Sequence, residues 1–161
     1  MFKVGDCAYY PAQGVGVVES IETREFSGQK HNFYILRIID NDMTIMVPVH
    51  NASQVGLRTL ISKEKVATIY DVLGEKQQAA QAMASWSRRQ REYNEKIKTG
   101  NPLEVAEVLR ELYLIREDKE LSYGEKKVLD LARRLLVKEL ALAEGVGEEA
   151  VTRRLETLVL N

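Results

Sequence analysis

The chain has 161 residues, 45% of them hydrophobic, and its 23 basic and 24 acidic residues leave a formal net charge of −1. This composition is typical of one globular domain or two small ones, and it excludes attraction of the whole molecule to nucleic acid. No apolar run approaches the roughly 18 residues that a membrane helix needs, and no signal-peptide pattern is apparent. The single cysteine, Cys7, excludes an internal disulfide. We therefore expect a cytoplasmic protein with no membrane partner.

The first sixty residues predict a small β-barrel. β-Branched and aromatic residues alternate with polar ones in four stretches, residues 7–10, 15–23, 33–39 and 43–47. Turn-forming residues separate these stretches, among them the pair Ser27-Gly28 and the polar segment 40–42. Four or five short strands in so few residues indicate a strongly bent barrel. We assign residues 1–60 to this domain.

The remaining residues, 61–161, predict a helical domain, so the fold class is α+β. Ser62, Asn101 and Ser122 are candidate N-caps, and the last two are followed by glutamate three positions later. Apolar residues then recur at helical spacing, which predicts four or five helices. Residues 75–84 are weakly patterned and favour either a linker or a frayed helical turn.

Signatures of catalysis and of metal binding are absent from the sequence. Gly14 and Gly16 begin like a dinucleotide fingerprint, but Glu19 stands where the third glycine is needed. His31 and His50 lack a second cysteine or a carboxylate cluster that would complete a metal site. We therefore expect no catalytic residues, no metal and no cofactor, and we predict that the protein is not an enzyme.

The segment 86–98 carries the strongest functional signal. It begins with the only tryptophan of the chain, and its five basic and two acidic residues give it a local charge of +3. A flat apolar ring beside arginines is typical of proteins that neutralise a phosphate backbone and insert a wedge between base pairs. We therefore name Trp86, Arg88, Arg89, Arg91 and Lys98 as candidate DNA-binding residues.

A structural interpretation fits the same segment equally well. In a helix that starts near Trp86, the side chains of Trp86, Tyr93 and Ile97 share one side and are candidates for the core. Arg88, Arg91 and Glu95 would then form an ordinary solvated face. From the residues alone, both interpretations remain open.

A set of short motifs resembles the CarD/CdnL-type bacterial transcription regulators. Each motif is weak alone, but their joint order and spacing over about residues 2–145 are specific. The motifs are Phe2-Lys-Val-Gly-Asp6, Tyr10-Pro-Ala-Gln-Gly-Val-Gly16, Ile21-Glu-Thr23, Val47-Pro48, Val55-Gly-Leu-Arg58, Trp86-Ser-Arg-Arg89, Lys96-Ile-Lys-Thr-Gly100, Ala106-Glu-Val-Leu-Arg110 and Leu121-Ser-Tyr-Gly-Glu-Lys126.

The resemblance implies a Tudor-like barrel that binds the β subunit of RNA polymerase, as in transcription–repair coupling factor. It places the polymerase contacts at Arg24, Met46, Val47 and Pro48. Some relatives carry arginine where this chain has Met46, so an ionic contact there would be replaced by an apolar one. Strand addition to the polymerase would tolerate such changes.

For the helical domain, the resemblance implies contact with promoter DNA at the upstream edge of the melted region. Trp86 matches the family tryptophan that wedges into the minor groove, and Arg88 and Arg91 match basic residues at the nearby backbone. Gln90 replaces an aromatic residue common in the family. The implied function is a monomeric initiation factor that stabilises the open promoter complex, notably at ribosomal RNA promoters, with little sequence specificity. The alternatives are an adaptor whose helical domain binds another protein, and an enzyme.

Overall fold

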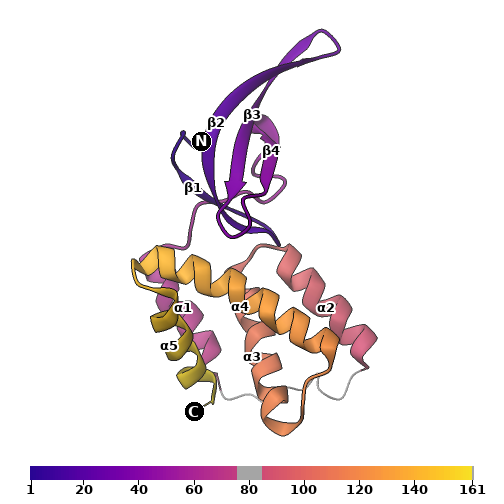
Figure 1. The fold of residues 1–161 in the computed structure, drawn as a ribbon, viewed down its shortest axis with the longest axis vertical. Helices are drawn as coiled ribbons and strands as arrows, with labels where there is room; N and C mark the ends of the chain where they lie inside the picture. Colours follow the sequence, from indigo (N-terminus) through magenta and orange to yellow (C-terminus); the bar gives the residue numbers. More distant parts are fainter. Residues whose placement is uncertain (76–84, 161) are drawn as a thin grey trace. The chain divides into compact units, whose positions relative to one another are not determined.

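The computed structural model describes residues 1–75 and 85–160, and it divides into two compact units, Met1–Leu60 and Ile61–Asn161. Most of the weakly patterned segment 75–84 lies outside the described residues. Figure 1 shows strands in the first unit and helices in the second.

The N-terminal unit is a curled, antiparallel half-barrel, which confirms the predicted Tudor-like barrel. Its strands are β1 (Cys7–Tyr10), β2 (Gly14–Phe26), β3 (Gln29–Ile38) and β4 (Thr44–Pro48), paired in the order β1-β2-β3-β4. The ladder between β2 and β3 shifts register between Val18 and Ser20, and such an irregularity bends a sheet. An isolated bridge between Tyr9 and Arg58 brings the chain back to β1 after the 3₁₀ turn Val49–Asn51.

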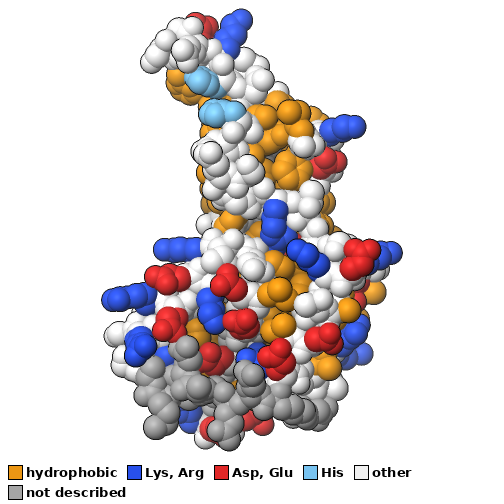
Figure 2. Space-filling model, turned by 180° about the vertical axis from the view of Figure 1, so that it is seen from behind, with side chains coloured by type: hydrophobic (Ala, Val, Ile, Leu, Met, Phe, Trp, Pro, Cys, Tyr) orange, Lys and Arg blue, Asp and Glu red, His pale blue; other side chains and the backbone are white. Residues whose placement is uncertain are grey.

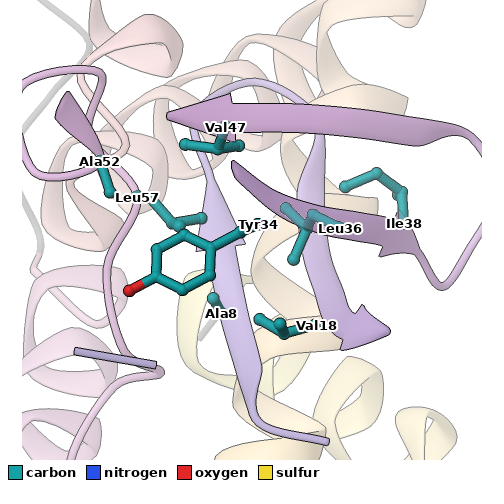
Figure 3. Packing of buried hydrophobic residues seen from close by; sticks show 8 residues of the cluster. All are labelled: Ala8, Val18, Tyr34, Leu36, Ile38, Val47, Ala52 and Leu57. Atoms are coloured by element: carbon teal, nitrogen blue, oxygen red, sulfur yellow. The ribbon is translucent and has the colours of Figure 1, made fainter. Parts of the chain in front are cut away.

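The core of this unit lies on the inner face of the curled sheet, as Figure 3 shows. Gly16 is required there, because a Cβ atom at this position would lie 2.7 Å from Cγ of Leu36. The Tyr34 ring packs in the same cluster, and its hydroxyl accepts a hydrogen bond from the Phe2 amide at 3.2 Å. The buried members are Ala8, Val18, Tyr34, Leu36, Ile38, Val47, Ala52 and Leu57.

Strands β2 and β3 are longer than the sequence predicts. They pair as far as Phe26 and Gln29, whereas β4 pairs with β3 only from Phe33 onward. The hairpin therefore extends past β4 as a two-stranded arm, which is visible in Figure 1. Its exposed polar residues gave no clear alternation to mark it as sheet.

The second unit is helical, as predicted. Its described helices are α1 (Lys63–Leu73), α2 (Trp86–Lys98), α3 (Pro102–Asp118), α4 (Tyr123–Glu144) and α5 (Glu148–Leu160). Helix α3 contacts each of the other four, and its side chains Val105, Val108, Leu109, Leu112 and Tyr113 are buried. Helix α3 is therefore the centre of this unit. None of the described helices is long and apolar enough to cross a membrane.

The predicted helix caps are confirmed. The Ser62 and Asn101 side chains accept hydrogen bonds from the amides of Lys65 and Leu103. Ser122 and Glu125 form the reciprocal capping box at the start of α4. At the other end of α4, Gly145 has φ +72°, a left-handed conformation that glycine adopts without strain. These caps fix where α1, α3 and α4 begin, and the start of α4 becomes important below.

Candidate functional site

Helix α2 presents two faces of different character. Tyr93 and Ile97 are buried, as is Arg89, while Arg88, Arg91, Glu95 and Lys98 are exposed. The Ser85 side chain caps this helix by accepting from the Arg88 amide at 3.4 Å, so Trp86 occupies its first helical position. The helix thus packs one face into the unit and leaves a basic face in solvent.

The Trp86 side chain is half-buried at the N-terminal end of α2. Its ring lies over Gly124, in the first turn of α4, and its centroid is 6.2 Å from that of Tyr93. The Arg89 guanidinium lies 5.2 Å from the centroid of the same ring, within the range of a cation–π contact. Trp86 is therefore held by contacts on α2 and α4 while part of it stays accessible.

Arg89 forms a buried ion pair with Glu125. Nη2 of Arg89 donates to Oε2 of Glu125 at 2.9 Å, and the two residues are only 3% and 2% exposed. The other carboxylate oxygen accepts from the Ser122 amide at 2.9 Å. Burial tends to raise the pKa of Glu125, but the hydrogen bonds from Ser122 and Arg89 outweigh it and hold that pKa below its ordinary value.

The expectation that Arg89 contacts DNA does not match this position. A guanidinium that is buried and paired with a carboxylate cannot also approach a phosphate without breaking that pair. Arg89 points to the interior because it lies on the same side of α2 as Tyr93. We assign it to the support of Trp86.

The exposed face of α2 keeps three of the predicted basic residues. The Arg88 side chain is 75% exposed and lies 3.6 Å from Glu92, while Arg91 and Lys98 are also exposed. The remaining basic residue, Lys96, pairs with Glu107 of α3 at 2.9 Å. The structural interpretation of this segment is confirmed for Tyr93 and Ile97, which are core, while Trp86 is only half-buried; the DNA-binding interpretation stays a prediction.

Sequence reasoning named Tyr123 and Gly124 only as part of the motif at residues 121–126 and did not assign them to this site. Tyr123 is 74% exposed at the first position of α4, and the Lys127 ammonium lies 4.8 Å from its ring centroid. The capping-box motif correctly predicted where α4 begins. No sequence signal predicted that this first turn would contact the Trp86 ring. The contact depends on how α2 and α4 pack around α3.

The barrel unit carries a partly apolar outer face. Adjacent residues of β3 and β4 pair as Phe33 with Pro48 and Ile35 with Met46, so these four side chains share one side of the sheet. Met46 is 44% exposed, and the other three are half-buried. Arg24 is exposed and pairs with Glu22 at 2.7 Å. Three of the predicted polymerase contacts, Arg24, Met46 and Pro48, are therefore accessible.

The Val47 side chain is buried and is not accessible to polymerase, so only its main chain could make the predicted contact. Val47 is 2% exposed and belongs to the core cluster, because it follows Met46 in a strand whose side chains alternate between faces. Its role is to pack β4 onto the core.

The two histidines lie together on the barrel unit, where Figure 2 shows them in pale blue. The ring centroids of His31 and His50 are 5.9 Å apart, and Phe26 is 6.2 Å from His31. Within the part of the chain that the structure describes, no cluster of three histidine, cysteine or acidic side chains could hold a metal ion.

The buried ion pair makes a prediction about acid stability. In the folded state the pKa of Glu125 is lowered from its ordinary 4.5, so its stabilisation is present above pH 4.5 and is lost as the pH falls through the folded value. Replacing Glu125 by Gln should destabilise the helical unit by about 3 kcal/mol at neutral pH and flatten its loss of stability below pH 4.5. Urea unfolding followed by Trp86 fluorescence measures both effects.

The matched control is Glu149→Gln, which removes an exposed ion pair to Arg153 at 3.8 Å. An exposed pair contributes at most about 1 kcal/mol, so this variant should behave like the wild type. If Glu125→Gln and the wild type lost stability in parallel below pH 4.5, the assignment to Glu125 would be wrong.

Comparison with known proteins identifies the family. The model described as "CarD-like/TRCF RID domain" matches residues 2–61, and the one described as "CarD, C-terminal domain" matches residues 68–156. A relative from Bacillus subtilis (strain 168), described as "Putative transcription factor YdeB", is 32% identical over 151 residues, 94% of this chain and 97% of that protein. The solved structure of CdnLNt from Myxococcus xanthus is 52% identical and covers 39% of this chain and 89% of its own, with a TM-score of 0.34. The chain therefore belongs to the CarD family of transcription factors, and its N-terminal unit is the RNA polymerase-interacting domain of that family.

Proposed function

We propose that this protein binds the β subunit of RNA polymerase and stabilises the open promoter complex. In this proposal the barrel unit docks on polymerase, and Trp86 wedges into the minor groove at the upstream edge of the bubble. Arg88, Arg91 and Lys98 contact the phosphates on either side. The observation that carries the proposal is the partly accessible Trp86 ring at the end of a helix whose free face is basic.

The support beneath Trp86 suits a wedge. An apolar side chain that enters a base step must resist being pushed aside, since unstacking costs a few kcal/mol per step. The ring is braced by Gly124 and Arg89 from within the unit. A braced ring loses little freedom on binding, so more of its contact energy is available for the distorted DNA.

A wedge favours the open promoter because it binds the two DNA states unequally. Ligands shift a two-state equilibrium only by the difference in their affinities, and each 1.4 kcal/mol of difference is about tenfold. Intact duplex must be unstacked before the ring can enter, whereas DNA at the edge of a bubble is already distorted. We therefore expect slower closing of the bubble.

The exposed arginines would hold the DNA without reading its sequence. Arg88 and Arg91 are exposed and within reach of phosphates, which every sequence presents alike. The charges elsewhere are mixed, and Figure 2 shows acidic and basic side chains interspersed over one face of the helical unit. Binding to DNA alone should therefore be weak, and polymerase would supply the targeting through high local concentration in the cytoplasm.

A protein-binding adaptor is the second candidate. Tyr123 is highly exposed next to the Trp86 contact, and an exposed aromatic cluster also suits a protein partner. Dependence on salt separates the two functions, because only contacts to phosphates release condensed counterions.

The first prediction of the proposed function concerns the outer face of the barrel unit. Replacing Met46 by Ser should weaken binding to the polymerase β subunit by about tenfold, the effect of losing one apolar contact of 1–2 kcal/mol near the centre of an interface. Ile21→Ser is the matched control: Ile21 is also 44% exposed, but it pairs with Tyr34 and so lies on the inner side of the sheet. Titration calorimetry measures both. If both variants lost the same affinity for polymerase, the outer face would not be the binding surface.

The second prediction concerns the wedge. Trp86→Ala should shorten the lifetime of the open complex while leaving the affinity for polymerase unchanged, because Trp86 belongs to the other unit. Lifetimes are measured by challenge with a DNA competitor, and affinity is measured in parallel. An open complex that decays equally fast with wild type and variant would exclude the wedge.

The third prediction concerns the phosphate contacts. On a forked promoter fragment, the double variant Arg88→Ala, Arg91→Ala should lower the slope of log K against log salt by about 0.9 per lost contact. Arg153→Ala is the control. Arg153 is 81% exposed, and like Arg88 it forms an ion pair with a glutamate four residues away in the same helix. Binding with no salt dependence, or an equal effect of the control, would favour the adaptor.

A further inference from the structure

The Trp86 ring rests on a glycine whose missing side chain makes the contact possible. A Cβ atom built on Gly124 would lie 3.0 Å from Cζ2, 3.1 Å from Nε1 and 3.2 Å from Cε2 of Trp86. These distances are shorter than ordinary van der Waals contact. The backbone of α4 therefore approaches the ring so closely that a side chain at position 124 would require the ring to shift by a few tenths of an ångström.

The local conformation of Gly124 does not explain the glycine. It is the second residue of α4 and is absent from the glycines with positive φ. Glycine in such a helical position is less favourable than alanine, because it loses more backbone freedom on folding. Helix formation alone does not favour glycine over alanine here, whereas the close contact with the Trp86 ring does.

A second contact fixes the ring from its own helix. The Arg89 guanidinium lies 5.2 Å from the ring centroid, and its ion pair to Glu125 anchors it to the residue that follows Gly124. Arg89 and Glu125 are both buried, so this pair is shielded from salt. Two neighbouring residues of α4 therefore act on Trp86, Gly124 by its small size and Glu125 through Arg89.

We propose that Gly124 and the Arg89–Glu125 ion pair form a platform that positions the Trp86 ring for its partner. Gly124 is a positioning residue: it sets how far the ring stands out from the helical unit, and Arg89 limits its tilt. The platform is a property of the free protein, and its value for DNA rests on the function proposed above. A ring held in place before binding loses little freedom when it inserts.

Gly124→Ala tests the platform, and the single tryptophan of the chain makes its fluorescence a direct readout. The added methyl group should push the ring outward, shifting its emission to the red and increasing its quenching by acrylamide. Gly147→Ala is the matched control, because Gly147 has no neighbour within 4 Å and no positive φ. Unchanged emission and quenching in Gly124→Ala would overturn the proposal.

A double-mutant cycle, measured by melting temperature, separates the coupling of Gly124 with Trp86 from general effects on folding. In the Trp86→Ala background, Gly124→Ala should raise the melting temperature, since alanine favours the helix and the clash is gone. In the wild-type background the same change should lower it or leave it unchanged. An equal rise in both backgrounds would mean that Gly124 and Trp86 are not coupled, and the platform would be wrong.

Open-complex lifetimes link the platform to function. Gly124→Ala should shorten the lifetime toward that of Trp86→Ala, with unchanged affinity for polymerase. If Trp86→Ala shortened the lifetime and Gly124→Ala did not, the platform would not position the ring for DNA. If neither variant changed the lifetime while the fluorescence and melting results held, the platform would stand and the proposed function would fall.

Discussion

The buried ion pair between Arg89 and Glu125 is the constraint on which the geometry of this site depends. A carboxylate taken out of water is tolerated only when it is compensated, and here the Glu125 carboxylate accepts hydrogen bonds from both the Arg89 guanidinium and the Ser122 amide. Glu125 thus caps the start of α4 and also ties α2 to it. Losing either partner would leave a buried charge without compensation, so the position of α2 against α4 is strongly specified.

Adjacent arginines of α2 have opposite environments as a result. Successive residues of a helix are rotated by about 100°, so Arg88 faces solvent while Arg89 faces α4. The same principle with a period of two divides the barrel strand, where Met46 is accessible and Val47 is core. In both elements, neighbouring residues of one sequence motif are therefore divided between the core and the surface that we propose for binding.

These divisions also mark what the sequence could and could not predict. Caps such as Ser62 and Ser122 act within one turn of the chain, and they were located correctly. Whether Arg89 is buried depends on a carboxylate 36 residues away, and whether Trp86 is accessible depends on Gly124. The burial of Val47 could have been predicted from the alternation of side chains along its strand. Its partner on the neighbouring strand, Tyr34, is also buried, as is Leu36 two residues later. The functional motif was clear, but the roles inside it are set by tertiary contacts.

If Trp86 acts as a wedge, its half-buried position and the few exposed arginines of α2 suit a factor that is delivered to DNA by another contact. A protein that finds DNA by itself needs a broad basic surface, because most of its affinity comes from phosphates. A protein held at the promoter by polymerase needs only a small difference in affinity between open and closed DNA. Burying Arg89 removes one exposed positive charge and fixes the ring that, in the proposed function, distinguishes the two states. In the proposed function, the Arg89–Glu125 ion pair therefore lowers the general affinity for DNA and increases the preference for open over closed promoter DNA.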